Sequence, residues 1–313
     1  MSQKINTSRF YFEFKGHTIP DVDAFRSTTL SLRPDKPIIY LAGDSSLDNK
    51  YWVPTSSPGS GVPLPVNVPE IYHAALTRPH PKPDVAFWLN HFLGDRATAL
   101  NLAVEASTLQ ERSDDLLEHD KFIRDNIRAE DTLVVSVGSN DIAMRPTIST
   151  IRHMLQLAWL TRHSSLEKGT AWCLGYFVRM FKSQVESYVS RLVEKEKPRA
   201  VIICMIYYPL EADASNQESW ADVPLKLMGY NRFPGQLQTA VRKMYELATK
   251  QIRIPGVQVV PCALFESLDG KCEDDYVARV EPSSEGGRKI ALQLIGSIDS
   301  LITAQTGGSD DTE

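Results

Sequence analysis

"PIIYLAGDSS", residues 37–46, is an apolar run that ends in a Gly-Asp-Ser turn. Four more short runs rich in β-branched residues recur along the chain, at 98–104, 131–138, 200–208 and 257–265. Nearly continuous apolar strands of this kind are typical of a parallel sheet covered on both faces. The sequence therefore predicts a five-stranded parallel sheet.

Longer segments with helical spacing separate these runs. Residues 176–197 and 236–252 each place their apolar side chains on one stripe, and a last helix is expected over 287–303. Strands that alternate with helices indicate a single doubly wound α/β domain. In such a domain the ligand crevice lies outside the carboxyl ends of the strands.

Length and charge limit the classes of protein that fit. The 313 residues suffice for one large core, so we expect one domain at 36–305, an N-terminal extension at 1–35 and a disordered tail at 306–313. The formal net charge of -5 argues against a nucleic-acid partner. The remaining partner is a small-molecule substrate, and the sequence does not fix the oligomeric state.

Targeting and metal-binding signals are missing from the pattern. The N-terminal stretch lacks the apolar core of a secretory signal, and nowhere do 18 apolar residues run together, so we expect no membrane insertion and a cytoplasmic location. The four cysteines show no C-x-x-C spacing. We expect neither a metal nor another cofactor.

Polar residues follow three of the predicted strands, at 43–48, 105–108 and 138–141. A serine in a tight turn between a strand and a helix can expose its hydroxyl, and the helix N-terminus favours negative charge. An asparagine amide and backbone N–H groups can form an oxyanion hole. The three turns are expected to converge on one site, with the long connections 50–84, 144–172 and 209–235 reaching over it as a lid.

The motifs resemble those of the SGNH (GDSL-type) hydrolases, a superfamily of esterases, lipases and related acyl-ester hydrolases. "GDSS" at 43–46 looks like its first block, "NLAVEAST" at 101–108 like its second and "GSND" at 138–141 like its third. The resemblance implies a flavodoxin-like strand order and esterase or acyl-transfer activity. It implies that Ser45 is the nucleophile and that the backbone N–H groups of Ser45 and Ala106 and the side chain of Asn140 bind the oxyanion. We assign Asp44 to the same binding group.

Two departures from the family pattern affect these roles. Ala106 stands where the family usually has glycine, a harmless change if its φ is negative and a strained one if its backbone is left-handed. In the fourth block, Asp-x-x-His-Pro, alignment on Pro282 puts Glu281 in place of the catalytic histidine and Ala278 in place of the aspartate. No histidine follows His163.

Glu281 can replace the histidine only if its carboxylate becomes a stronger base. Burial raises the pKa of a carboxyl group, whereas the neighbouring Arg279 would lower it. Three alternatives follow. Glu281, assisted by Asp275 or Asp274, acts as the base of a serine esterase or acyl transferase. His73, His80 or His163 folds over the crevice and supplies the imidazole.

In the third alternative the protein does not catalyse hydrolysis. It is instead a non-hydrolytic acid/base enzyme, such as an isomerase, cyclase or lyase, that uses Glu281 and an aspartate, or a ligand-binding protein without catalysis. We favour the first alternative, with a small apolar or aromatic ester as substrate. Asp48 and Asp141 are expected to stabilise turns rather than to act as acids.

Overall fold

The computed structural model describes residues 4–55, 63–214 and 218–306. Its central sheet consists of the five parallel strands that the sequence predicts, in the order β2-β1-β3-β4-β5. These strands are β1 (Ile38–Gly43), β2 (Thr98–Asn101), β3 (Thr132–Ser136), β4 (Ala200–Met205) and β5 (Gln258–Ala263). All but β5 are buried along their whole length, which is why they read as continuous apolar runs.

A short antiparallel pair, β6 (Tyr276–Val277) and β7 (Glu281–Pro282), follows the sheet. The α-helices are α1 (Thr7–Phe12), α2 (Ile19–Leu32), α3 (Glu70–Ala75), α4 (Val85–Leu93), α5 (Glu111–Asp114), α6 (Glu118–Asn126), α7 (Ser139–Ala143), α8 (Ile148–Leu155), α9 (His163–Glu167), α10 (Leu174–Val178), α11 (Val185–Leu192), α12 (Asp222–Leu227), α13 (Pro234–Leu247) and α14 (Ser284–Thr306). Two π-helical segments extend α8 and join α10 to α11, at Gln156–Leu160 and Arg179–Gln184.

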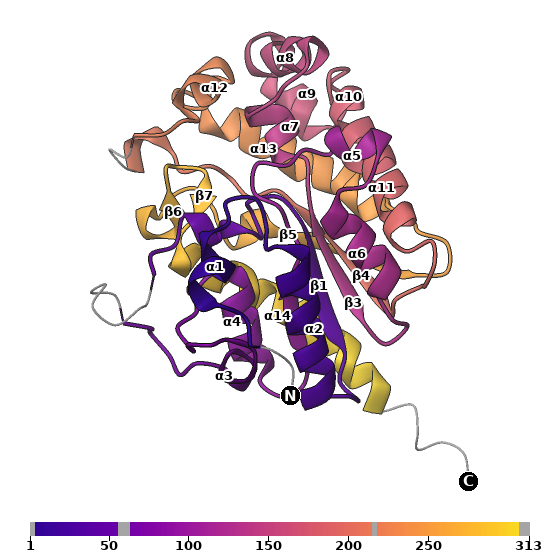
Figure 1. Cartoon of the computed structure of the whole chain (residues 1–313). Coiled ribbons are helices and arrows are strands. Elements are labelled where there is room, and N and C mark those ends of the chain that lie inside the picture. Colours follow the sequence, from indigo (N-terminus) through magenta and orange to yellow (C-terminus); the bar gives the residue numbers. More distant parts are fainter. Residues whose placement is uncertain (1–3, 56–62, 215–217, 307–313) are drawn as a thin grey trace.

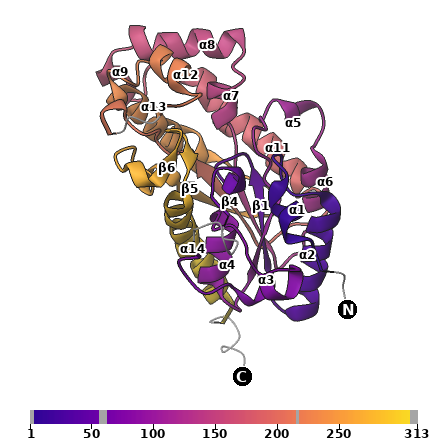
Figure 2. The ribbon, with the colours of Figure 1, turned by 60° about the vertical axis from the view of Figure 1, so that its left-hand side comes forward.

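Helices cover both faces of the sheet (Figures 1 and 2). α4 and α14 pack against each other on one face, and α2, α6 and α11 lie on the other. The apolar stripe predicted for residues 176–197 is buried from Phe177 to Leu192. These side chains belong to α10, the π-helical segment that follows it and α11. The architecture is therefore the doubly wound α/β fold that the pattern of the sequence predicts.

The N-terminal residues contribute to this body. Phe10 of α1 and Val22 and Phe25 of α2 are buried in the main core, and α2 contacts β2, α3 and α6. The described part of residues 1–35 is therefore packed against the domain. The predicted tail, 306–313, lies outside the described residues except for Thr306.

Two of the three segments expected to form the lid, 144–172 and 209–235, gather at one end of the molecule. The described part of 50–84 lies instead beside the N-terminal residues, where Ile5 pairs with Leu76 and α1 contacts the turn Asn49–Tyr51. α8, α9, α10 and α12 lie together beyond the carboxyl ends of the central strands (Figures 1 and 2). The connection 144–172, expected as a loop, is largely helical and contains α8, a π-helical segment and α9. No helix in the described ranges is both long enough and apolar enough to cross a bilayer.

Candidate active site

The turns after β1, β2 and β3 meet at one edge of the sheet, as the sequence predicts. Gly43 pairs in register with Ser136, and its carbonyl accepts a hydrogen bond from the backbone N–H of Val104 at 2.9 Å. Gly43 is required because its φ is +147° and a Cβ there would lie 1.9 Å from the Ser136 oxygen. This close approach brings Ser45 beside the second and third turns.

The turn that carries Ser45 differs from the expected strand-to-helix bend. Residues 44–47 form a turn, and in the described parts of 48–69 a single 3₁₀ turn, Asn49–Tyr51, precedes α3, which begins at Glu70. No α-helix N-terminus therefore follows Ser45 directly. The helix that does begin at the site is the short α7, with Asn140 in its first turn.

The turns after β1, β2 and β3 each contain a candidate N–H donor. Within the described chain, the backbone N–H groups of Ser45 and Ala106 donate no hydrogen bond. The amide of Asn140 donates one hydrogen bond, to the carbonyl of Ser107 at 2.9 Å, and so retains a second N–H. These are the three donors that the motif resemblance assigns to an oxyanion.

Ala106 has a φ of +59°, the left-handed conformation that the sequence analysis identified as the strained case. A non-glycine residue in this region costs about 1–2 kcal/mol. The structure holds this conformation although no glycine is present. The site therefore stores backbone strain at one of its candidate oxyanion donors.

Glu281 lies on β7 with 2% of its surface exposed. Burial raises the pKa of its carboxyl to about 7, the hydroxyl of Ser45 and the indole of Trp220 favour the ionised form, and Asp44 favours the neutral form. One carboxylate oxygen, Oε2, has no hydrogen-bond partner among the described residues. A carboxyl with this pKa is half ionised near neutral pH.

The structure separates Glu281 from two residues expected to affect it. Asp275 accepts a hydrogen bond from Lys289 of α14 at 2.7 Å, and Asp275 is not among the groups that shift the pKa of Glu281. The guanidinium of Arg279 bonds to Asp222 of α12, to Asn231 and to the carbonyl of Leu210. The expectation that Arg279 lowers the pKa of Glu281 is wrong, because its charge is directed at the lid.

No histidine takes the position beside Ser45. All seven histidines lie within the described residues, and none lines the pocket next to Glu281. Of the histidines considered as replacements, His163 has its Nε2 atom 3.5 Å from the hydroxyl of Thr239 on α13, and His73 is exposed on α3. Glu281 is thus the titratable group beside the Ser45 hydroxyl.

Asp44 and the two acidic turn residues serve as acceptors that hold the turns together. Asp44 accepts hydrogen bonds from Ser46 and, at 2.7 Å, from the hydroxyl of Ser139, so it ties the first turn to the third. Asp48 accepts from the backbone of Glu105, and Asp141 accepts from the backbone of Leu109 and Gln110. These contacts confirm the turn-stabilising role expected for Asp48 and Asp141.

Glu105 is a second buried carboxyl at the site, with 1% of its surface exposed. Burial, followed by the charges of Glu281 and Asp48, raises the pKa of Glu105 to about 9. Its Oε2 atom, like that of Glu281, has no hydrogen-bond partner in the described chain, while Oε1 accepts from the indole of Trp52 at 3.4 Å. Glu105 is therefore protonated at neutral pH.

The sequence analysis did not single out Glu105, although a signal was present. Glu105 opens the polar segment directly after the second strand, and the motif resemblance drew attention to Ala106 instead. Behind Glu105, Lys50 forms an ion pair with Asp48 at 2.7 Å, and both side chains are fully buried. This pair neutralises one of the acidic groups around the site.

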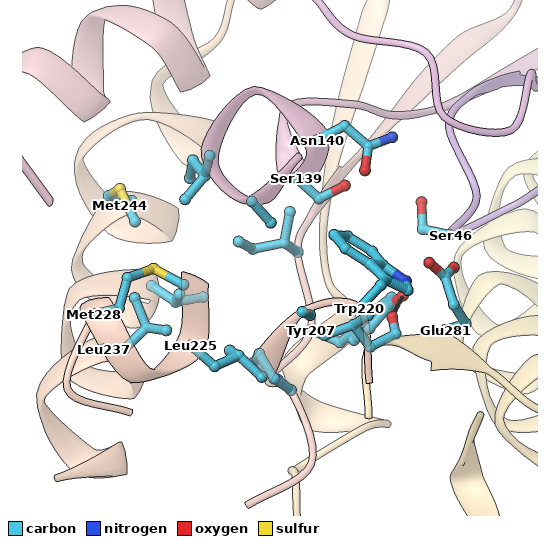
Figure 3. Close-up of a pocket in the computed structure, with 17 residues that line it drawn as sticks. Ser46, Ser139, Asn140, Tyr207, Trp220, Leu225, Met228, Leu237, Met244 and Glu281 are labelled. Atoms are coloured by element: carbon cyan, nitrogen blue, oxygen red, sulfur yellow. Dashed lines mark hydrogen bonds between the residues drawn. The ribbon is translucent and has the colours of Figure 1, made fainter. Parts of the chain in front are cut away.

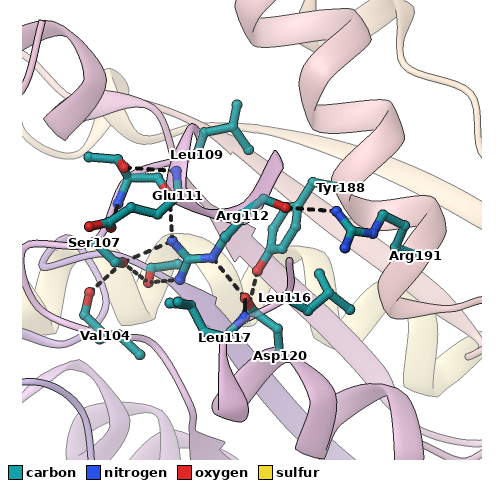
Figure 4. Close-up of polar contacts among 12 residues, drawn as sticks. Val104, Ser107, Leu109, Glu111, Arg112, Leu116, Leu117, Asp120, Tyr188 and Arg191 are labelled. Carbon is teal, nitrogen blue, oxygen red and sulfur yellow. Dashed lines mark hydrogen bonds and ion pairs between the residues drawn. The ribbon is translucent and has the colours of Figure 1, made fainter. Parts of the chain in front are cut away.

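The buried side chain of Arg112 holds the turns after β1 and β2 in place (Figure 4). The buried guanidinium of Arg112 donates to the carbonyl of Gly43 at 2.9 Å, to the hydroxyl of Ser107 at 2.9 Å and to Asp120 at 3.0 Å. Asp120 also accepts from the hydroxyl of Tyr188 at 2.7 Å. One side chain thereby joins the end of β1, the second turn, α6 and α11.

An apolar pocket extends from Glu281 toward the lid (Figure 3). It holds about 770 Å³ of space free of protein atoms, its open mouth included. The polar groups Ser46, Ser139, Asn140 and Glu281 lie at one end, and Leu225, Met228, Leu237 and Met244 lie at the other. The arrangement suits a ligand with one polar, reactive end and one apolar end.

No group of three or more His, Cys, Asp or Glu side chains in the described ranges is arranged to hold a metal ion. The buried carboxyls are instead paired with hydroxyl, amide, indole and lysine groups. What the site offers chemically is a hydroxyl, two carboxyls that differ in pKa and a set of N–H donors.

Comparison with solved structures finds proteins of similar fold. They include an extracellular lipase from Streptomyces rimosus (10% identity, covering 85% of this chain and 99% of that chain, TM-score 0.45). A carbohydrate acetylesterase from Sinorhizobium meliloti matches at 11% identity over 85% of this chain and 100% of that chain, with a TM-score of 0.42. An aryl esterase from M. smegmatis, in an inhibitor-bound form, matches at 13% identity over 85% and 99%, with a TM-score of 0.41.

These proteins are named as a lipase, an acetylesterase and an aryl esterase. No protein-family model matches the chain, and no curated protein sequence matches it.

Proposed function

We propose that the protein is a serine esterase or acyl transferase that acts on an ester with an apolar acyl group. The observation that carries this proposal is the buried Glu281 carboxyl, which lines the polar end of an apolar pocket and whose ionised form is favoured by the Ser45 hydroxyl. Its pKa of about 7 suits a general base at neutral pH. The intrinsic weakness of a glutamate, relative to histidine, is thereby offset by burial.

In the proposed reaction, ionised Glu281 accepts the proton of Ser45 as its oxygen attacks the ester carbonyl. The N–H groups of Ser45 and Ala106 and the Asn140 amide stabilise the oxyanion. The protonated Glu281 then returns the proton to the leaving alcohol as the C–O bond breaks, leaving an acyl-serine. Water or an acceptor alcohol, deprotonated by Glu281, then attacks the acyl carbonyl, and Glu281 returns this proton to the Ser45 oxygen as the acyl–serine bond breaks.

Hydrolysis of p-nitrophenyl esters of increasing chain length tests this proposal. We expect turnover that improves from acetate to medium-chain esters, because the pocket is apolar. Ser45→Ala should abolish it, and Glu281→Gln should lower kcat by about 10²–10⁴-fold, the usual contribution of a general base. Ser46→Ala is the matched control, since the Ser46 hydroxyl is bonded to Asp44 and Ser136.

One observation favours a second candidate, a proton-transfer enzyme of the isomerase, cyclase or lyase type. Glu105 and Glu281 each have a buried carboxyl oxygen without a partner in the described chain, and burial separates their pKa values. Two carboxyls of this kind can act as acid and base. This function predicts that Glu281→Gln abolishes turnover of a non-ester substrate while Ser45→Ala retains it.

A further inference from the structure

Large apolar side chains are exposed along one face of α8. Ile148, Ile151 and Leu155 repeat at helical spacing and are 89%, 41% and 39% exposed, whereas Met154 of the same helix is buried. A soluble amphipathic helix normally turns such a stripe toward the core. α8 therefore presents an apolar stripe outward in addition to the side chains that it buries.

Neighbouring lid segments continue this surface. Leu160 is 79% exposed, Trp172 68% and Val223 68%. The indole of Trp159 donates to the carbonyl of Leu227 at 2.9 Å, joining the segment after α8 to α12, and the rings of His153 and Trp172 lie 6.2 Å apart, joining α8 to the start of α10. We call this surface the lid face: Ile148, Ile151, Leu155, Trp159, Leu160, Trp172, Val223 and Leu227.

The larger of the two segments that carry the lid face is basic, whereas the segment 209–235, which carries Val223 and Leu227, contains four acidic and two basic residues. Residues 144–182 contain six Lys or Arg and one acidic residue, a net charge of +5, whereas the chain carries -5. Arg152, Arg162, Lys168 and Arg179 are exposed. Arg152 lies next to Ile151 on α8, and Arg162 follows Leu160 by two residues, so exposed basic side chains accompany the apolar groups on the α8 side of the lid face.

The lid face also roofs the apolar pocket. A second apolar cavity, lined by Met154, Leu157 and Phe177 under α8 and α10, shares Ile142, Met228, Leu237 and Met244 with the pocket beside Glu281. Apolar lining thus continues from the candidate site to the underside of the lid segments. A molecule leaving a lipid surface would meet this lining directly below the lid face.

We propose that the lid face is a docking surface for an anionic lipid bilayer. Exposed tryptophan and aliphatic side chains with surrounding arginine and lysine are the features with which a monotopic protein binds such a surface, by shallow burial of apolar groups and attraction to acidic headgroups. Because basic side chains accompany the apolar groups, an anionic membrane fits this surface better than an apolar protein surface that lacks acidic groups. This inference does not depend on the reaction proposed above.

Flotation with vesicles of ether-linked lipids tests the proposal, because these lipids contain no ester that the protein could hydrolyse. The full chain should bind vesicles of phosphatidylcholine with about 30 mol% phosphatidylserine more tightly than pure phosphatidylcholine. Arg152→Gln with Arg162→Gln should weaken binding to the anionic vesicles about fivefold per residue. The combined variant Ile148→Ser, Leu160→Ser, Trp172→Ser should lose binding to both.

Phe12→Ser is the matched control, because Phe12 is 84% exposed on α1, and α1 lies away from α8, α9, α10 and α12 in both views (Figures 1 and 2). It should bind as the unmodified chain does. All substituted side chains are exposed, and circular dichroism should show an unchanged fold. Failure of the unmodified chain to bind, equal binding to the two vesicles, or full binding by the Ser variant of the lid face would overturn the proposal.

Discussion

At the scale of single residues, the site is defined by how its buried carboxyls differ. Asp48 is paired with Lys50, Asp44 accepts from three donors of Ser46 and Ser139, and Glu105 is neutral at pH 7. Burial raises the pKa of Glu281 to about 7. The carboxyl of Glu281, beside Ser45, therefore gains or loses its negative charge near neutral pH.

The pH dependence of ester hydrolysis should report this charge. Glu281 acts as a base only when ionised, and its pKa is about 7. We therefore expect kcat/KM to fall about tenfold per pH unit below this value and to level off above it. A profile measured with p-nitrophenyl esters that is flat between pH 5 and 8 would contradict this role.

Glu105→Gln should stabilise the fold in a pH-dependent manner. The folded protein keeps Glu105 protonated up to about pH 9, whereas the unfolded chain ionises it from about pH 4.5, so the neutral folded form becomes more costly as pH rises between these values. Glutamine removes a cost of about 3 kcal/mol at pH 7 and under about 1 kcal/mol at pH 5. Urea unfolding at both pH values measures the difference.

The exposed Glu196→Gln is the control for this measurement, and its effect should be small and independent of pH. An equal effect of Glu105→Gln at the two pH values would show that Glu105 is ionised in the fold.

Ala106→Gly should raise the free energy of unfolding by about 1 kcal/mol, because glycine adopts a φ of +59° without steric cost. Ala74→Gly within α3 should have the opposite sign, since glycine lowers helix stability by about 0.5–1 kcal/mol. Thermal or urea unfolding of the two variants compares them. A destabilised Ala106→Gly would argue against strain at this turn.

At the scale of elements, Arg112 links the turns to the helices that support them. Replacing it by Met should destabilise the protein by about 3–5 kcal/mol, because the substitution leaves Asp120 buried without its ion-pair partner. Arg124→Met, which breaks solvent-accessible contacts with Asp125 and Glu194, should change stability little. Equal effects in chemical denaturation would show that the buried network is dispensable.

Helices and strands could be predicted where the apolar side chains of the sequence pattern are also the side chains that the fold buries. The five central strands and the helices over 174–192 and 234–247 have continuous or striped apolar side chains that face the core. α8 was expected as a loop, since a helix that exposes Ile148 and Ile151 lacks a clean polar face. The contacts that bury α1 and α2, formed by Phe10 and Phe25, come from elements distant in sequence.

Only some features of the candidate site could be predicted from the sequence. The meeting of the turns after β1, β2 and β3 could be predicted because parallel strands end at one edge of the sheet. The partners of Asp275 and Arg279 could not, because they depend on how α14 and α12 pack. The acidity of Glu105 depends on its depth and on Glu281, which lies far away along the chain.

At the scale of the whole molecule, reactive groups, apolar pocket and lid face lie in succession. The sheet edge supplies the hydroxyl and the carboxyls, the pocket leads away from them, and the lid segments place basic and apolar side chains outermost. This order suits a substrate with an apolar chain delivered from a lipid surface. It also predicts that substitutions on the lid face alter vesicle binding but leave hydrolysis of short, soluble esters unchanged.

Labelling with a fluorophosphonate tests the central claim, that Ser45 is a nucleophile activated by Glu281, most directly. Intact-mass and peptide analysis at pH 8 should show one adduct on Ser45 in the unmodified chain and in Ser46→Ala, none in Ser45→Ala, and much slower labelling in Glu281→Gln. A correctly folded chain that takes up no label, or takes it up at another serine, would contradict the account.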